Sequence, residues 1–115
     1  MSITIKKVEG WAAKKKTPKL LKALSADGLD VRISAIKALG TIQDENVMHS
    51  LIALLKDPNA SIRGSAVEAL GILGNGRSLE FVRQLWMNEQ DSEVLEKARQ
   101  AIVKIKANTV QTEKV

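Results

Sequence analysis

Few residues in this sequence have the chemistry for catalysis, and they are not arranged as catalytic groups usually are. There is one histidine, His49, and no cysteine. A serine nucleophile needs a histidine base within hydrogen-bond reach and a strained turn that exposes it, and no such motif is present. Thiolate metal sites are excluded because the chain has no cysteine. We therefore predict no catalytic residue, no metal site and no cofactor, and we expect His49 to face solvent.

Two arginines recur together with their surroundings. Residues 30–42 (DVRISAIKALGTI) and 61–73 (SIRGSAVEALGIL) match at six of thirteen positions, including Arg32/Arg63 and Gly40/Gly71. Self-similarity at a fixed period, here 31 residues, predicts a helical repeat array. We expect each arginine to bind an aspartate or a carbonyl group of a neighbouring repeat; contact with a ligand is the alternative. We expect each glycine to permit close helix approach, since no glycine-rich phosphate loop is present.

Positive charge is concentrated near the start of the chain. The formal net charge is +5, yet residues 1–26 alone carry seven lysines against Glu9, a net of +6. This distribution favours an anionic partner at one end of the molecule, although a solvated lysine run is the plainer interpretation. The lysines concerned are Lys14, Lys15, Lys16, Lys19 and Lys22.

Apolar spacing and turn residues predict an all-α chain of three helix pairs. Pro18 suits a first helical turn, Pro58 ends one helix before the next begins, and Asp91 is suited to capping a third-unit helix. Residues 1–16 are a basic segment that either caps the array as a helix or lies free. The predicted helices are 18–26, 29–41, 46–56, 60–73, 78–88 and 92–107, in a repeat domain 17–107 (units 17–43, 44–75 and 76–107) followed by a frayed tail 108–115.

The pattern of a helix, Asp-Pro-Asn and then x-[VI]-R-x-S-A-x-x-A-L-G-x-[IL] resembles HEAT repeats, specifically the short type of the phycobilisome bilin lyases. The resemblance covers about residues 17–107. It implies a right-handed α-solenoid whose second helices line a concave face, and it implies macromolecular binding more often than catalysis. Metal-dependent HEAT-like enzymes carry several His-Glu motifs, and this chain has none.

The predicted partner-binding surface is the side of each second helix opposite its apolar core stripe. Ile33, Ile36 and Val67 would then be exposed apolar groups in a groove, which suggests a binding surface. The full predicted concave set is Ile33, Ile36, Lys37, Val67, Glu68, Arg99, Gln100 and Lys104.

These observations favour a non-enzymatic scaffold or adaptor that binds another protein through its concave face. The alternatives are a binder of an anionic partner, nucleic acid or acidic protein, through the lysine-rich first unit, and a regulatory subunit of a modifying enzyme. We expect a cytoplasmic chain, since no run of about 18 apolar residues or signal-peptide core is present. We expect a monomer or a weak homodimer.

Overall fold

The computed structural model describes residues 2–113, and within them there are seven α-helices, one short 3-10 helix and no strand. The elements, in chain order, are α1 (Ile5–Ala13), α2 (Thr17–Ala23), α3 (Leu29–Leu39), α4 (Glu45–Leu54), α5 (Ala60–Leu73), η1 (Gly76–Ser78), α6 (Leu79–Asn88) and α7 (Ser92–Glu113).

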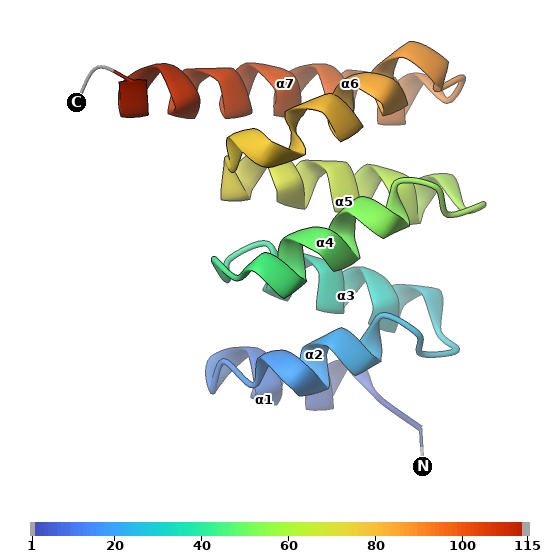
Figure 1. The fold of residues 1–115 in the computed structure, drawn as a ribbon. Helices are drawn as coiled ribbons and strands as arrows, with labels where there is room; N and C mark the ends of the chain where they lie inside the picture. Colours follow the sequence, from blue (N-terminus) through green and yellow to red (C-terminus); the bar gives the residue numbers. More distant parts are fainter. Residues whose placement is uncertain (1, 114–115) are drawn as a thin grey trace.

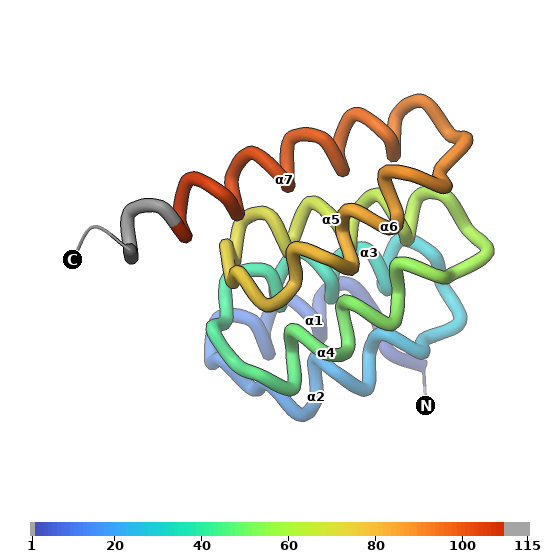
Figure 2. The backbone as a smooth tube through the Cα atoms, turned by 45° about the horizontal axis from the view of Figure 1, so that its top comes forward, coloured from blue at the N-terminus to red at the C-terminus, as the bar shows by residue number. Residues whose placement is uncertain are grey.

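The helices lie in two layers. Helices α2, α4 and α6 form one layer, called here the A layer, and α1, α3, α5 and α7 form the other, the B layer (Figures 1 and 2). Each B-layer helix packs on the next, and α4 and α6 pack mainly on the B-layer helices that follow them. The extents of 46 × 35 × 17 Å fit an open stack two helices thick. The all-α fold is therefore confirmed as an α-solenoid of helix pairs.

Side-chain caps mark where the helices begin. The carboxylate of Asp44 accepts hydrogen bonds from the backbone N–H groups of Asn46 and Val47 at the start of α4. Asn59 caps α5 in the same way, and the Asp91 carboxylate accepts from two N–H groups in the first turn of α7. Each cap satisfies donors that have no partner within the helix, so these short polar residues fix the points at which the chain re-enters the array.

The period of about 31 residues is visible in the core. Leu20, Leu51 and Val82, each 31 residues from the next, are fully buried in successive A-layer helices. Ala35 and Ala66 are likewise fully buried in the B layer, as is Ala98 at a spacing of 32. Because each layer repeats the same small or branched apolar side chains, successive pairs can stack with one packing geometry.

The first end of the array follows one of the two predicted alternatives for residues 1–16, a helix that caps the array, whereas the tail differs from the prediction. The first segment forms α1, which packs on α2 and α3 and buries Val8, so it joins the B layer as its first helix. The predicted tail is helical as far as Glu113, since α7 continues through residue 108. Asn108 donates to the carbonyl oxygen of Gly74 at 2.8 Å, and the Thr109 hydroxyl donates to that of Ile105. These bonds hold the segment to the helix and to α5; residues 114–115 lie outside the described residues.

Two glycines let the B-layer helices approach closely, as predicted. A Cβ atom built on Gly40 would lie 3.0 Å from Cβ of Ala69, and one on Gly71 would lie 3.0 Å from both Cα and Cβ of Ala101. Both distances are shorter than a relaxed carbon–carbon contact. A glycine at each position therefore sets the spacing between α3 and α5 and between α5 and α7.

Replacing Gly71 with alanine should lower the free energy of unfolding by about 2 kcal/mol, because overpacking against the α7 backbone outweighs the better helix propensity of alanine. Gly64→Ala is the matched control on the same helix. Its added Cβ would meet only the Lys97 and Val94 side chains at 3.5 Å. This variant should be as stable as the wild type or slightly more so. Urea unfolding followed by circular dichroism measures both, and equal destabilisation would contradict the spacer role of Gly71.

Candidate partner-binding surfaces

The two repeated arginines join successive helix pairs rather than a ligand. At the start of α3, Arg32 donates through Nε to the carbonyl oxygen of Leu24 at 2.8 Å and through Nη2 to the Asp57 carboxylate at 2.9 Å. Leu24 ends α2 of the same pair, whereas Asp57 follows α4 of the next pair. The predicted role in binding an aspartate or carbonyl of the neighbouring repeat is confirmed for this residue.

Arg63 repeats the arrangement one pair further on. It donates to both carboxylate oxygens of Glu89 at 2.8 and 2.9 Å, and its Nη1 donates to the carbonyl oxygens of Asp57 and Pro58. The Glu89 side chain is only 4% exposed. The parallel two-bond geometry is the strong form of an arginine–carboxylate pair. Arg32 and Arg63 with their acceptors are called here the arginine ladder.

The ladder holds its carboxylates in the charged form. The Arg63 guanidinium, helped by the backbone N–H groups of Asp91 and Gln90, holds the pKa of Glu89 below its usual value despite burial. The backbone N–H of Asn59, followed by the Arg32 guanidinium, does the same for the pKa of Asp57. Both pairs are therefore ionised at neutral pH and stabilise the folded chain there.

The predicted exposure of two apolar members of the concave set, Ile36 and Val67, is wrong. Ile36 is 1% exposed and Val67 is fully buried, and Ile33 is half-buried. A B-layer helix is contacted on three sides, by its A-layer partner and by the B-layer helices before and after it. Ile36 and Val67 lie one turn before Gly40 and Gly71, which face Ala69 and Ala101 of the following B-layer helices, and residues four apart share one side of a helix. The following helix therefore covers this side, and only a narrow outer strip of each helix meets water.

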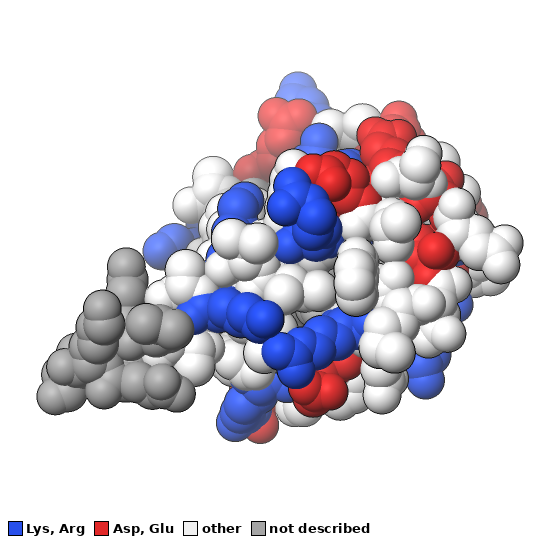
Figure 3. Space-filling view, turned by 90° about the horizontal axis from the view of Figure 1, so that it is seen from above, with Lys and Arg blue, Asp and Glu red and all other residues white. Residues whose placement is uncertain are grey.

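Arg99 is exposed for the reason that Val67 is buried: exposure depends on whether a following helix covers that side. It lies 32 residues after Val67, on the side of α7 that no described helix covers, and it is exposed. Its guanidinium donates to Glu96 at 2.6 and 2.9 Å and lowers the pKa of that carboxyl to about 2. Figure 3 looks on this end of the array and shows charged side chains of both signs dispersed in uncharged surface. Arg99 therefore lies on the end of the stack and not on its B-layer face.

The remaining predicted residues do lie on the outer strip. Lys37 is exposed, and Glu68, one period later, is half-buried; neither has an ion-pair partner within the described residues. Sequence reasoning missed Ile72, which is 58% exposed four residues after Glu68, and Lys97, which lines a small cavity together with Glu68 and Lys104. We call this set the B-layer strip: Lys37, Glu68, Ile72, Lys97, Gln100 and Lys104.

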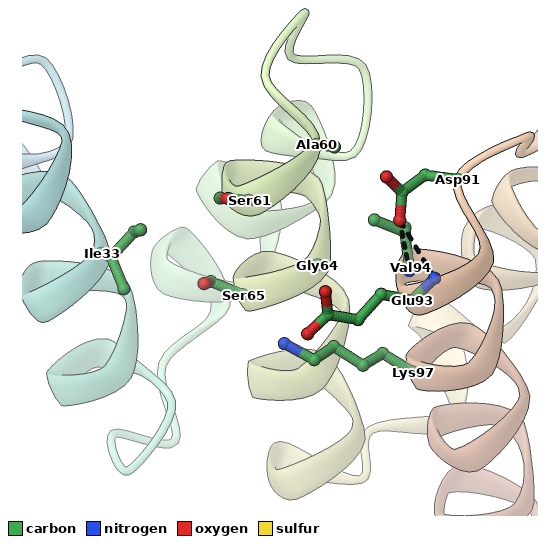
Figure 4. A pocket seen from close by; sticks show the side chains of 9 residues that line it. All are labelled: Ile33, Ala60, Ser61, Gly64, Ser65, Asp91, Glu93, Val94 and Lys97. Atoms are coloured by element: carbon green, nitrogen blue, oxygen red, sulfur yellow. Dashed lines mark hydrogen bonds between the residues drawn. The ribbon is translucent and has the colours of Figure 1, made fainter.

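A shallow cavity of about 220 Å³ opens at one end of the B-layer strip. Figure 4 shows Ile33 of α3 on one side and the Glu93 and Lys97 side chains of α7 reaching across Gly64 from the other. The hydroxyl groups of Ser61 and Ser65 lie between them on α5. Gly64 opens the cavity because it has no side chain. The sequence contained a signal for this, since the equivalent residue of the first repeat, 31 positions earlier, is Ile33. The cavity offers polar groups of both charges beside one apolar side chain.

The lysine cluster lies at the other end of the array. Lys14, Lys15 and Lys16 form the turn between α1 and α2, with Lys15 in the left-handed region at φ 52°, and all three are exposed. Lys19 and Lys22 follow on α2, and the Lys19 ammonium group lies 5.7 Å from the centre of the Trp11 ring. None of the five lysines has a carboxylate within ion-pair distance among the described residues. All five lie on α2 and the turn before it, in the first pair of helices.

The histidine lies apart from both surfaces. His49 is exposed on α4, as predicted, and its Nε2 atom is 3.5 Å from Glu45, which also accepts from Arg77. Within residues 2–113, no three histidine, cysteine or acidic side chains converge as metal ligands would. None of the helices in that range is long and apolar enough to cross a membrane.

The stacked helix pairs and their ladder of inter-pair arginines define a helical repeat protein. Residues 17–103 match the family model of HEAT repeats, and the chain therefore belongs to the HEAT repeat family. Proteins of this family are generally scaffolds for protein interaction and are typically not enzymes. Comparison with curated proteins gives no match to this chain.

Removing one arm of the ladder should destabilise the array strongly. Arg63→Ala leaves the nearly buried Glu89 carboxylate unpaired, and we expect a loss of about 2 kcal/mol in the free energy of unfolding. Arg83→Ala, which breaks the exposed Arg83–Glu80 pair within α6, is the control and should change stability little. Denaturant unfolding measures the free energy of unfolding of both variants. Similarly small losses for Arg63→Ala and Arg83→Ala would contradict the role of the ladder.

The ladder should also make stability depend on acid pH. A carboxylate whose pKa is lowered by folding stabilises the native state above the pKa of the unfolded chain, about 4.3 for glutamate. That stabilisation is lost as pH falls through the lower pKa of the folded state. Glu89→Gln should therefore be less stable than the wild type at pH 7, and the difference should narrow between about pH 5 and pH 3. Glu93→Gln serves as the control, because this exposed carboxylate has no ion-pair partner within residues 2–113. A stability difference between Glu89→Gln and the wild type that stays constant with pH would exclude this linkage.

Proposed function

We propose that the chain is a non-enzymatic adaptor that binds a partner protein through the B-layer strip. The observation that supports this is the set of charged side chains left without partners around an exposed isoleucine. Lys37, Glu68 and Lys104 make no ion pair with described residues, while Ile72 between them is largely exposed. Charges of both signs around an apolar centre are typical of a specific protein interface with a polar rim.

The repeats are short and resemble those of the phycobilisome bilin lyases in their helix-Asp-Pro-Asn pattern. We take the similarity to concern the repeat alone, because those lyases are longer heteromeric proteins. The support for a binding role comes instead from the surface of this chain and from what its family generally does.

A second candidate is a binder of anionic partners, which uses Lys14, Lys15, Lys16, Lys19 and Lys22. The observation that favours it is the presence of five exposed lysines on α2 and the turn before it, none of which has an ion-pair partner among the described residues. Contacts of this kind depend steeply on salt when they track a nucleic-acid backbone.

The experiment that separates these candidates is affinity capture with matched variants, with and without nuclease. Ile72→Glu should abolish retention of the partner above about 0.3 M salt, where surface charge is strongly screened. Lys14/Lys15/Lys16→Glu should leave that retention unchanged. Val103→Glu is the control for adding a charge at an apolar surface site, since Val103 is exposed in the middle of α7, one turn after Arg99 on the side that ends the stack. Substitution of Ile36 or Val67 cannot serve here, because a buried carboxylate there would unfold the chain.

Loss of binding only in the lysine variant, with elution at low salt, would assign function to the lysine cluster instead. Retention by both variants would contradict both assignments.

A further inference from the structure

The A layer carries an apolar groove where a solvent-facing surface is expected to be polar. It lies between α4 and α6, with a cavity volume of about 440 Å³. Leu55 is almost fully buried and Ile52 and Leu85 are half-buried, while Phe81 forms a side of the groove and is 47% exposed. The groove is open because α6 packs mainly on α7 and makes few direct contacts with α4.

The apolar character is specific to this part of the layer. The positions 62 and 31 residues before Phe81 are Lys19 and Ser50, so the same site is polar in the two preceding A-layer helices. A phenylalanine that is half exposed leaves apolar surface in water and contributes only part of the stabilisation that full burial would give. A packing role for the core alone does not account for it, whereas a partner that covers the ring would.

The charges around the groove favour one kind of partner. The carboxylates of residues next to the lining residues in the chain, called here the rim carboxylates, are already paired: Asp57 with Arg32, Glu80 with Arg83, and Glu89 with Arg63. Lys56, which lines the groove, has no ion-pair partner among the described residues.

Further basic side chains continue from Lys56 along the A layer. Lys22 on α2 lies 31 residues before Ala53, so it occupies the equivalent position on the adjacent A-layer helix, and Lys19 lies one turn before it. Both are exposed. The unneutralised charge next to the apolar groove is therefore positive.

We propose that the groove between α4 and α6 docks an acidic amphipathic helix of a partner protein. Its apolar side chains, at helical spacing, would cover Phe81 and contact Ile52 and Leu85, and its carboxylates would pair with Lys56 and Lys22. A helix laid in an apolar groove is recognised through side chains three or four residues apart, and the groove has apolar side chains on both of its walls, from α4 and from α6, for such side chains to contact. This site is on the layer opposite the B-layer strip and does not depend on that proposal.

The test uses two synthetic peptides of about 16 residues, a length at which a helix can form on binding. Both have leucines at i, i+3, i+4 and i+7; one has glutamates and the other lysines at the remaining positions. Fluorescence anisotropy gives the dissociation constants, and nuclear magnetic resonance shifts of labelled protein map the site. We expect the acidic peptide to bind at least ten-fold more tightly than the basic one, with shifts centred on α4 and α6.

Two variants make the assignment specific. Phe81→Ser introduces the residue found one repeat earlier, and Lys56→Glu reverses the charge at the groove. Each substitution should raise the dissociation constant of the acidic peptide at least five-fold. Met87→Ser is the matched control, since Met87 is an apolar residue of the same helix that is 75% exposed and does not line the groove. Circular dichroism confirms that each variant is folded.

Four results would overturn the proposal, and the first three concern affinity. They are absence of binding by the acidic peptide at 1 mM, equal binding of the two peptides, and equal weakening by Met87→Ser and Phe81→Ser. Shifts confined to the B-layer strip would likewise place the peptide on the other face and reject this groove.

Discussion

The arginine ladder is the interaction on which the regular stacking of this chain depends. Helix packing through alanine and leucine side chains is favourable but not strongly directional, and neighbouring registers would bury similar apolar area. Arg32 and Arg63 remove this freedom, because each guanidinium must reach a carbonyl group of its own pair and a carboxylate of the next. Bidentate geometry tolerates little displacement. The close contacts at Gly40 and Gly71 then act on helices whose register is already fixed.

Features that repeat were predictable from the sequence, and features that depend on what surrounds a helix were not. The recurrence of Arg32 and Gly40 at Arg63 and Gly71 was enough to predict inter-repeat binding and close approach, since both roles belong to the repeat itself. The exposure of Ile36 and Val67 was predicted wrongly, because helical periodicity shows which side faces the A-layer partner but not how much the next B-layer helix covers. The exposure of Ile72 was missed for a related reason: its equivalent in the first repeat is the polar Thr41, so the repeat pattern does not mark this position as an apolar surface site.

The groove beside Phe81 illustrates a further limit. The sequence shows that a phenylalanine replaces serine and lysine, yet a substitution of this kind could equally fill a gap in the core. Only the spacing of α4 and α6 shows that the ring remains half exposed. Pairing of the rim carboxylates depends on rotamers and on the positions of three different helices, and this three-dimensional arrangement is what leaves Lys56 as the unneutralised charge.

The ladder also has a consequence for how such a chain can change during evolution. Arg63 donates to a carbonyl oxygen in the turn after α4 and to the Glu89 carboxylate in the turn after α6. The middle helix pair, α4 and α5, therefore contains both an arginine that binds the next pair and, in Asp57, a carboxylate that the preceding arginine binds. A tandem duplication of this pair would present each new copy with a complete set of matching contacts. Length could thus be gained in steps of 31 residues without any new interaction, and the surface available for recognition would grow in the same increments.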